Sequence, residues 1–225
     1  AELEPLAVAL VRGAYEFQGQ KCSAASRAYV PKSLWPKLKE RVLAHIAEIK
    51  MGDVADFSNF MGAVINERAY TRLSGWRDRL KKDASCTVLA DAGWSREVGW
   101  FCGPTLVQVT DPKHDLMQEE LFGPVLSVFV YDDAKVDETL ALVDSTSPYA
   151  LTGAIFSQES AGNVYVNDKP TGAVVGQQPF GGARASGTND KAGSAFNLLR
   201  WVSPRTLKET FAPPTSVGYP FMRER

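Results

Sequence analysis

The chain after Asp83 alternates short apolar runs with amphipathic stretches, and this alternation restricts the fold more than any other feature of the sequence. Five runs rich in β-branched and aromatic residues follow Asp83: Cys86–Ala90, Thr105–Val109, Val125–Tyr131, Leu151–Phe156 and Val164–Asn167. A helical pattern over 136–143 separates two of them. Near-continuous apolar strands are typical of sheets that are buried on both faces. The sequence therefore predicts an α/β fold with a mostly parallel sheet covered by helices.

Three helices are predicted before Asp83. The first begins near Pro5 and ends at Gly19, the second follows an N-cap at Ser33, and the third follows an N-cap at Asn66. Each carries apolar residues at helical spacing, which indicates one buried face. A strand-like run from Arg27 to Val30 lies between the first two helices. This pattern extends the α/β reading to the first half of the chain.

The connection between the last two predicted strands is too short for a parallel pair. Ser157 to Gly162 supplies six residues, whereas a parallel crossover needs a dozen or more. Two readings follow: an antiparallel hairpin turning at Ala161 and Gly162, or a sequence that lacks part of the natural chain. We predict the second, with a helix omitted at this point.

Composition excludes several classes of function. Lys and Arg number 25 against 26 Asp and Glu, and the net charge of −1 provides no general cationic field for nucleic acid or anionic membranes. Three cysteines and two histidines, without metal-ligand spacing, predict neither a disulfide framework nor a metal site. With no apolar run of membrane-spanning length and no signal peptide, we expect a soluble, intracellular protein.

Cys22 is the strongest candidate for a nucleophile. It follows the first predicted helix directly after Gly19, Gln20 and Lys21. A thiol at such a break can face a cleft, where backbone N–H groups and a nearby cation favour the reactive thiolate. By residue type alone, a cysteine beside small residues is also compatible with buried packing, and Lys21 with a solvated side chain.

Two motifs in this order resemble those of the aldehyde dehydrogenase superfamily. The first is Tyr15, three residues, then Gly19-Gln-Lys-Cys22 followed by small residues, and the second is Glu119-Glu-Leu-Phe-Gly-Pro-Val125. Nearly the whole chain also resembles one branch, the Δ1-pyrroline-5-carboxylate dehydrogenases, through Gln18–Ser23, Val143–Thr146 and the stretch Asn167–Lys191. The resemblance implies NAD-dependent oxidation of L-glutamate γ-semialdehyde to L-glutamate, a step of proline catabolism.

The resemblance assigns roles to individual residues. Cys22 would be the catalytic nucleophile, and Glu120 and Phe122 would contact NAD. The predicted substrate-binding residues are Lys21, Ser23, Gly172, Ala173 and Phe180. Ala173 stands where the branch often has serine. Without the motif, Glu119 and Glu120 read as an exposed helix end and Phe122 as a core anchor.

The resemblance also implies what this chain does not contain. No G-x-G-x-x-G motif is present, and we expect the nucleotide-binding half of the family to lie outside this sequence. We therefore expect a catalytic domain over 1–204, a C-terminal oligomerisation strand and tail over 205–225, and low activity for the isolated chain. The complete enzyme would be a homo-oligomer, at least a dimer, in a bacterial cytoplasm or, in a eukaryote, the mitochondrial matrix.

Three alternatives stay open. A cysteine hydrolase or acyltransferase could pair Cys22 with His45 or His114. The chain could be an assembly module whose strand over 205–211 pairs across subunits. Among dehydrogenases, another short semialdehyde, such as succinic semialdehyde, could be the substrate.

Overall fold

The computed structural model describes residues 2–154, 163–166, 183–184, 206–209, 215–218 and 222. Its elements are α1 (Leu3–Tyr15), η1 (Glu16–Gly19), β1 (Arg27–Pro31), α2 (Trp35–Ala47), α3 (Glu67–Leu80), β2 (Cys86–Ala90), β3 (Thr105–Val109), α4 (Asp115–Gln118), β4 (Val125–Tyr131), η2 (Asp133–Lys135), α5 (Val136–Ser145), β5 (Tyr149–Ala150), β6 (Thr152–Ala154), β7 (Asn163–Val166), β8 (Ala183–Arg184) and β9 (Thr206–Glu209). None of the helices described here has the length and apolar character needed to cross a membrane. The alternation confirms the predicted α/β class.

The larger sheet has the strand order β1-β4-β3-β2. Strand β4 lies between β1 and β3 and runs parallel to both, whereas β2 pairs with β3 in the antiparallel direction. The prediction of a mostly parallel sheet is therefore confirmed, with one antiparallel edge strand.

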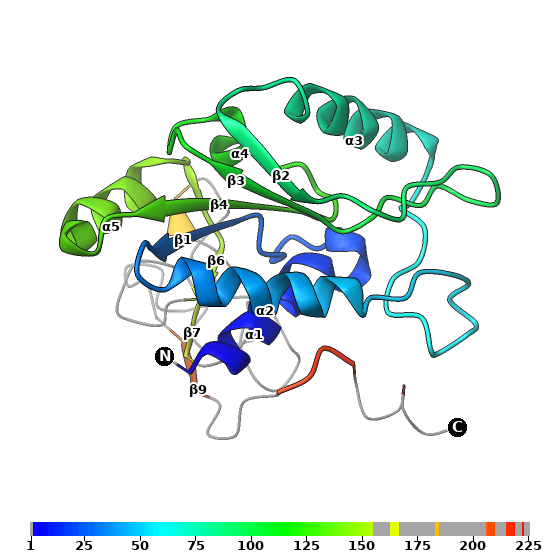
Figure 1. Cartoon of the computed structure of the whole chain (residues 1–225), viewed down its shortest axis with the longest axis horizontal. Helices are drawn as coiled ribbons and strands as arrows, with labels where there is room; N and C mark the ends of the chain where they lie inside the picture. The colour runs from blue at the N-terminus through cyan, green and yellow to red at the C-terminus, as the bar shows by residue number, and fades with distance from the viewer. Residues whose placement is uncertain are drawn as a thin grey trace, which may run out of the picture.

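Helices cover this sheet on both faces (Figure 1), as the apolar strands predicted. On one face, α1 and α2 pack against side chains such as Leu106 of β3 and Leu126 of β4. On the other, α3 and α4 pack against Val107 and Val125, which are the sequence neighbours of those two residues. Successive strand residues point to opposite faces, so each central strand contributes to both cores. Because β3 and β4 are packed on both faces, the loops at their ends start from rigid strands.

The two predicted helix caps have different outcomes. The Asn66 side chain accepts a hydrogen bond from the N–H of Ala69 at 3.0 Å, which confirms the N-cap of α3. The Ser33 cap is wrong, because α2 begins after Leu34 without a side-chain cap. Ser33 instead donates its backbone N–H and its hydroxyl to Asp133, and these bonds lower the pKa of that carboxyl group. Ser33 therefore bonds to Asp133, which is 100 residues away in the sequence, and does not cap α2.

A second sheet has the order β6-β7-β9, with both pairs parallel. The hairpin reading of the short connection is wrong, because β6 and β7 run in the same direction with Thr152 opposite Asn163. The residues between them, 155–162, lie outside the described part. The strand expected over 205–211 is present at Thr206–Glu209 but pairs with β7 of its own chain, so an intersubunit role stays a prediction.

Candidate active site

The loop after α1 carries the predicted nucleophile. Helix α1 ends at Tyr15, and the short helix η1 continues to Gly19, where the sequence predicted the stop. The buried Tyr15 hydroxyl donates to the carbonyl of Thr105 at 3.1 Å. The chain then takes a left-handed turn, with φ of 51° at Phe17, 61° at Gln18 and 65° at Gly19. Non-glycine residues in this region are strained and concentrate at functional sites. Cys22 follows this turn and is exposed.

Gly19 brings the two sequence motifs into direct contact. A Cβ atom at this position would lie 2.3 Å from the carbonyl oxygen of Gly123 and 2.8 Å from that of Ala14. Both distances are far below van der Waals contact, and the positive φ also favours glycine. The nucleophile loop and the Glu119–Val125 segment therefore meet at a place where no side chain fits.

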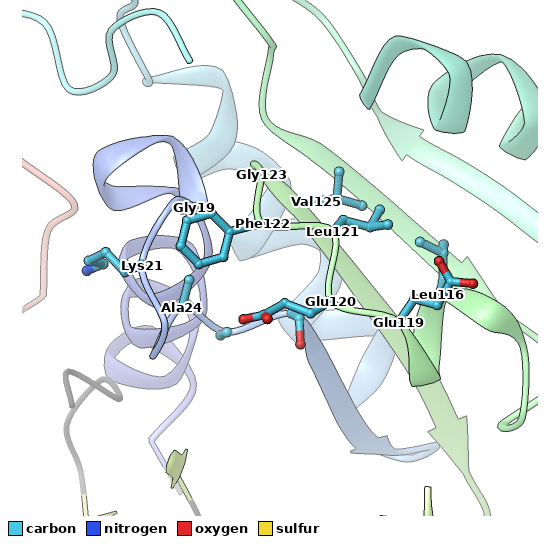
Figure 2. A pocket seen from close by; sticks show the side chains of 12 residues that line it. Gly19, Lys21, Ala24, Leu116, Glu119, Glu120, Leu121, Phe122, Gly123 and Val125 are labelled. Carbon is cyan, nitrogen blue, oxygen red and sulfur yellow. The ribbon is translucent and has the colours of Figure 1, made fainter. Parts of the chain in front are cut away.

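A pocket opens between these two segments (Figure 2). Its lining comes from Gly19, Lys21, Ala24, Ala25, Ser26, Leu116, Glu119, Glu120, Leu121, Phe122, Gly123 and Val125. The fold supplies the two sides from the end of α1 and from the connection between β3 and β4. The motifs that the sequence placed about a hundred residues apart thus form one site.

The paired glutamates point in different directions. Glu120 extends toward the loop that carries Lys21 and Ala24, whereas Glu119 extends away from it, near Leu116 (Figure 2). Phe122 is 41% exposed and adopts a φ of 49°. A carboxylate and a bare aromatic ring on the pocket wall can accept hydroxyl donors and support a planar ring, respectively. Phe122 is therefore not the core anchor that its residue type alone suggested.

The Lys21 ammonium group already has a carboxylate partner. Its Nζ atom lies 2.9 Å from Oε2 of Glu16, whose side chain is only 6% exposed, and 5.6 Å from the centre of the Phe17 ring. A nearby carboxylate balances the positive charge. This pairing weakens the expectation that Lys21 shifts Cys22 toward the thiolate or attracts a substrate carboxylate, although Lys21 does line the pocket.

The remaining predicted substrate contacts are placed only in part. Ser23 is 2% exposed, in contrast to its exposed neighbour Cys22, so its hydroxyl is covered. Gly172, Ala173 and Phe180 lie outside the described residues. The structure therefore places the loop of Cys22 beside Glu120 and Phe122, although the pocket lining includes neither Cys22 nor Ser23. The roles of these residues and the substrate anchor stay predictions.

Both histidines are hydrogen-bonded to carboxylates and not to Cys22, the predicted nucleophile. His45 Nε2 is 2.7 Å from a carboxylate oxygen of Glu4, and His114 Nε2 is 3.1 Å from one of Asp83. A Cys–His nucleophile requires a hydrogen bond between thiol and ring. The geometry of the described residues thus speaks against a cysteine hydrolase built on Cys22.

Sequence reasoning missed the side chain that links the two loops. Gln20 Oε1 accepts a hydrogen bond from the N–H of Ile65 at 2.9 Å, and its Nε2 approaches the carbonyl of Phe122 at 3.5 Å. Gln18 similarly donates to the carbonyl of Ala63 at 3.0 Å. Glutamine between a glycine and the nucleophile was a usable signal as part of the motif, but its partners lie 45 and 102 residues away.

Comparison with known proteins gives a consistent family. The model of the aldehyde dehydrogenase family matches residues 1–206. A mitochondrial delta-1-pyrroline-5-carboxylate dehydrogenase of Dictyostelium discoideum is 51% identical over 225 residues, covering 94% of this chain and 40% of that protein. The human protein of the same name is 48% identical over 237 residues, covering 99% and 42%. The chain thus spans about two fifths of the length of these relatives.

Solved structures agree. The delta-pyrroline-5-carboxylate dehydrogenase of Mycobacterium tuberculosis superposes with a TM-score of 0.80 at 45% identity, covering all of this chain and 44% of that one. The same protein bound with NAD gives a TM-score of 0.78 at 46% identity.

The human comparison extends over 237 residues, although this chain has 225. At least 12 aligned positions therefore have no counterpart here.

Proposed function

The chain belongs to the aldehyde dehydrogenase family, and from this premise we propose that it forms the nucleophile-bearing part of an enzyme that oxidises L-glutamate γ-semialdehyde to L-glutamate with NAD in proline catabolism. The observation that carries the proposal is the pocket in which the loop of Cys22 meets Glu120 and Phe122 across the Gly19–Gly123 contact. The names of the relatives support the choice of substrate.

Cys22 supplies the covalent chemistry. Its thiolate attacks the aldehyde carbon, and the carbonyl oxygen becomes the oxyanion of a thiohemiacetal, to which backbone N–H groups such as that of Cys22 can donate. Loss of a hydride from the same carbon leaves a thioester on Cys22, and attack by water releases L-glutamate and restores the thiol. When bound, NAD accepts that hydride.

Glu120 and Phe122 fit the cofactor side of this reaction. The Glu120 carboxylate only accepts hydrogen bonds, which suits the two hydroxyls of the nicotinamide ribose. The exposed Phe122 ring offers an apolar surface beside a flat nicotinamide. These two residues bind and orient, and Cys22 alone forms bonds to the substrate carbon.

The substrate's α-carboxylate needs a receptor away from the nucleophile. Gly172 and Ala173 would provide backbone N–H groups, and Phe180 an apolar wall against the methylenes. The Ser23 hydroxyl, which is covered in this structure, would contribute only if it is uncovered in the complete enzyme. Lys21 contributes through its shape on the pocket wall more than through charge, because Glu16 balances it.

The wider organisation follows the same proposal. Residues 1–204 form the nucleophile-bearing domain and 205–225 a C-terminal strand and tail, in an enzyme assembled as a homo-oligomer of at least two subunits. A nucleotide-binding half elsewhere in the polypeptide would hold most of the NAD. The eukaryotic relatives are named mitochondrial, and we propose the mitochondrial matrix in a eukaryote or the cytoplasm in a bacterium.

The proposal is tested by the aldehydes that the complete enzyme accepts. If the α-carboxylate is held, kcat/KM for L-glutamate γ-semialdehyde should exceed that for butyraldehyde by two or more orders of magnitude, because charge-assisted hydrogen bonds contribute about 1.5–3 kcal/mol each. Succinic semialdehyde should fall between them. Equal values would reduce the assignment to a general aldehyde dehydrogenase, and a preference for succinic semialdehyde would assign another branch.

A further inference from the structure

Asp83, Cys86 and His114 form a cluster outside the pocket that the mechanism does not use. Their ligand atoms all lie within 4.8 Å of one another, with His114 Nε2 3.1 Å from Asp83 Oδ2 and 3.5 Å from Cys86 Sγ. Such a trio invites a metal-binding or a nucleophilic interpretation. The hydrogen bonds of the His114 ring favour a different role.

The His114 ring has a defined tautomer. Its Nδ1 accepts the backbone N–H of Leu116 at 3.0 Å, so the proton of the neutral ring is on Nε2. Hydrogen bonds from Ser85 hold the pKa of Asp83 at about 2, and the resulting carboxylate accepts the Nε2–H. A metal ion at Nε2 would require this proton to leave or to move to Nδ1, where it would break the hydrogen bond from Leu116. The protonated Nε2 also cannot act as a base toward Cys86.

His114 instead caps a helix that leads into the pocket. It occupies the N-cap of α4, which spans Asp115–Gln118, and it is 9% exposed. The helix ends at Gln118 with Glu119 as its C-cap, and Glu120 and Phe122 of the pocket wall follow within four residues. One acceptor atom of a buried ring thus fixes the first turn of the segment that carries both cofactor candidates.

The supporting contacts reach His114 from a different part of the fold. Asp83 lies in the turn between α3 and β2, where Ser85 donates to it from its hydroxyl at 2.6 Å and from its backbone N–H at 2.9 Å. Asp83 in turn holds the Nε2–H of His114. This chain of bonds orients the ring so that Nδ1 faces α4, in the way that an outer carboxylate orients a histidine.

We propose that His114 is a positioning residue for cofactor binding, acting through the Nδ1 cap on α4 with Asp83 fixing its tautomer. The inference rests on the proposed function for its link to NAD. Residues typical of N-caps are serine, threonine, aspartate and asparagine, so asparagine can replace the acceptor without the ring. Phenylalanine keeps the ring and removes the acceptor.

The experiment compares His114→Phe with His114→Asn in the complete enzyme. Loss of a cap makes His114→Phe bind NAD roughly fivefold more weakly and exchange the amide hydrogens of the α4 segment roughly fivefold faster. His114→Asn should restore both values to within about twofold of the native enzyme. The rate of Cys22 alkylation by iodoacetamide should be unchanged in both, because the opposite loop is not touched.

Two results would overturn the inference. Either both variants lose NAD affinity and amide protection equally, which would show that ring packing matters, or neither variant differs from the native enzyme. If the native enzyme itself fails to bind NAD, the proposed function fails, whereas the amide exchange of the two variants still decides the role of the cap. A variant that does not fold is recognised by its unfolding transition, and Asp83→Ala then serves as a second route to loosen the ring.

Discussion

Two pairs of neighbouring parallel strands in this chain are joined by connections of very different length. Between β3 and β4, residues 110–124 include α4, its histidine cap and the pocket wall of Glu120 and Phe122. Between β6 and β7, residues 155–162 provide eight residues. A parallel pair normally needs a crossover of a dozen or more. The long connection has room to build a functional site, and the short one falls below the ordinary minimum.

The longer connection, between β3 and β4, is held in place by packed residues, and these define the geometry of the site. In the β3–β4 connection, buried Leu116 and Leu121 anchor the segment, and Gly123 is pressed against both Leu73 and Gly19. The loop that carries Cys22 meets this segment at the Gly19–Gly123 backbone contact, and the Gln20 side chain adds an approach to the carbonyl of Phe122. The geometry of this loop therefore depends on the missing side chains of Gly19 and Gly123 as much as on hydrogen bonds.

The largest expected effect concerns the short connection. We predict that the active enzyme contains at least the 12 additional positions that the human relative shows in the comparison, inserted between β6 and β7 as a helical crossover. Peptide mass spectrometry of enzyme purified from its source should find no contiguous peptide running from Phe156 through Ser157 to Asn163. That peptide, recovered from fully active enzyme, would remove the contrast between the two connections.

The next effect concerns the contact between the loops. Gly19→Ala should destabilise the protein by about 2–5 kcal/mol, because alanine is disfavoured at positive φ and its Cβ would clash with the Gly123 carbonyl. Urea unfolding measures the change. Gly75→Ala is the matched control: it lies within α3 with nothing within 4 Å of a Cβ, and should stabilise by about 0.5–1 kcal/mol. Equal changes in the free energy of unfolding for the two substitutions would show that the contact between Gly19 and Gly123 does not contribute to stability.

A smaller effect is expected at the pocket wall. Glu120→Gln replaces a carboxylate that only accepts with an amide that also donates, so hydride transfer should slow about tenfold while the protein stays as stable as before. Glu119→Gln, which alters the glutamate directed away from the loop, should change the rate less than twofold. Single-turnover formation of NADH checks both, and equal effects would return the pair to the role of an exposed helix end.

The sequence was sufficient for the fold class and for the two motifs that meet. Apolar strands such as Val125–Tyr131 show burial on both faces directly, and the Asn66 cap is a local signal that holds in the structure. The direction of the pairing between β6 and β7, however, needed the structure. From the length of the connection alone, an antiparallel hairpin between these strands was also possible.

What the sequence could not predict depends on side-chain partners that are settled only in the folded chain. Histidine is not among the usual N-cap residues, so His114 gave no signal until Leu116 and Asp83 were placed around it. The charge of Lys21 looked available until Glu16 was found buried beside it. Ser33 had a competing partner, Asp133, 100 residues away. Asp83 and Asp133 are distant partners, whereas Glu16 is only five residues from Lys21 and the structure was needed to show that the two side chains pair.

Trapping the acyl intermediate tests the central claim most directly. The complete enzyme is mixed with NAD and L-glutamate γ-semialdehyde, quenched in acid during the first turnover, and digested for mass spectrometry. We expect the acyl group on the peptide that contains Cys22, and a loss of at least about a thousandfold in NADH formation for Cys22→Ser. Cys102→Ser, at a fully buried thiol whose pKa burial raises to about 12, should keep the rate. An acyl group on another residue, or NADH formation by Cys22→Ser at the rate of the native enzyme, would contradict the assignment of Cys22 as the nucleophile.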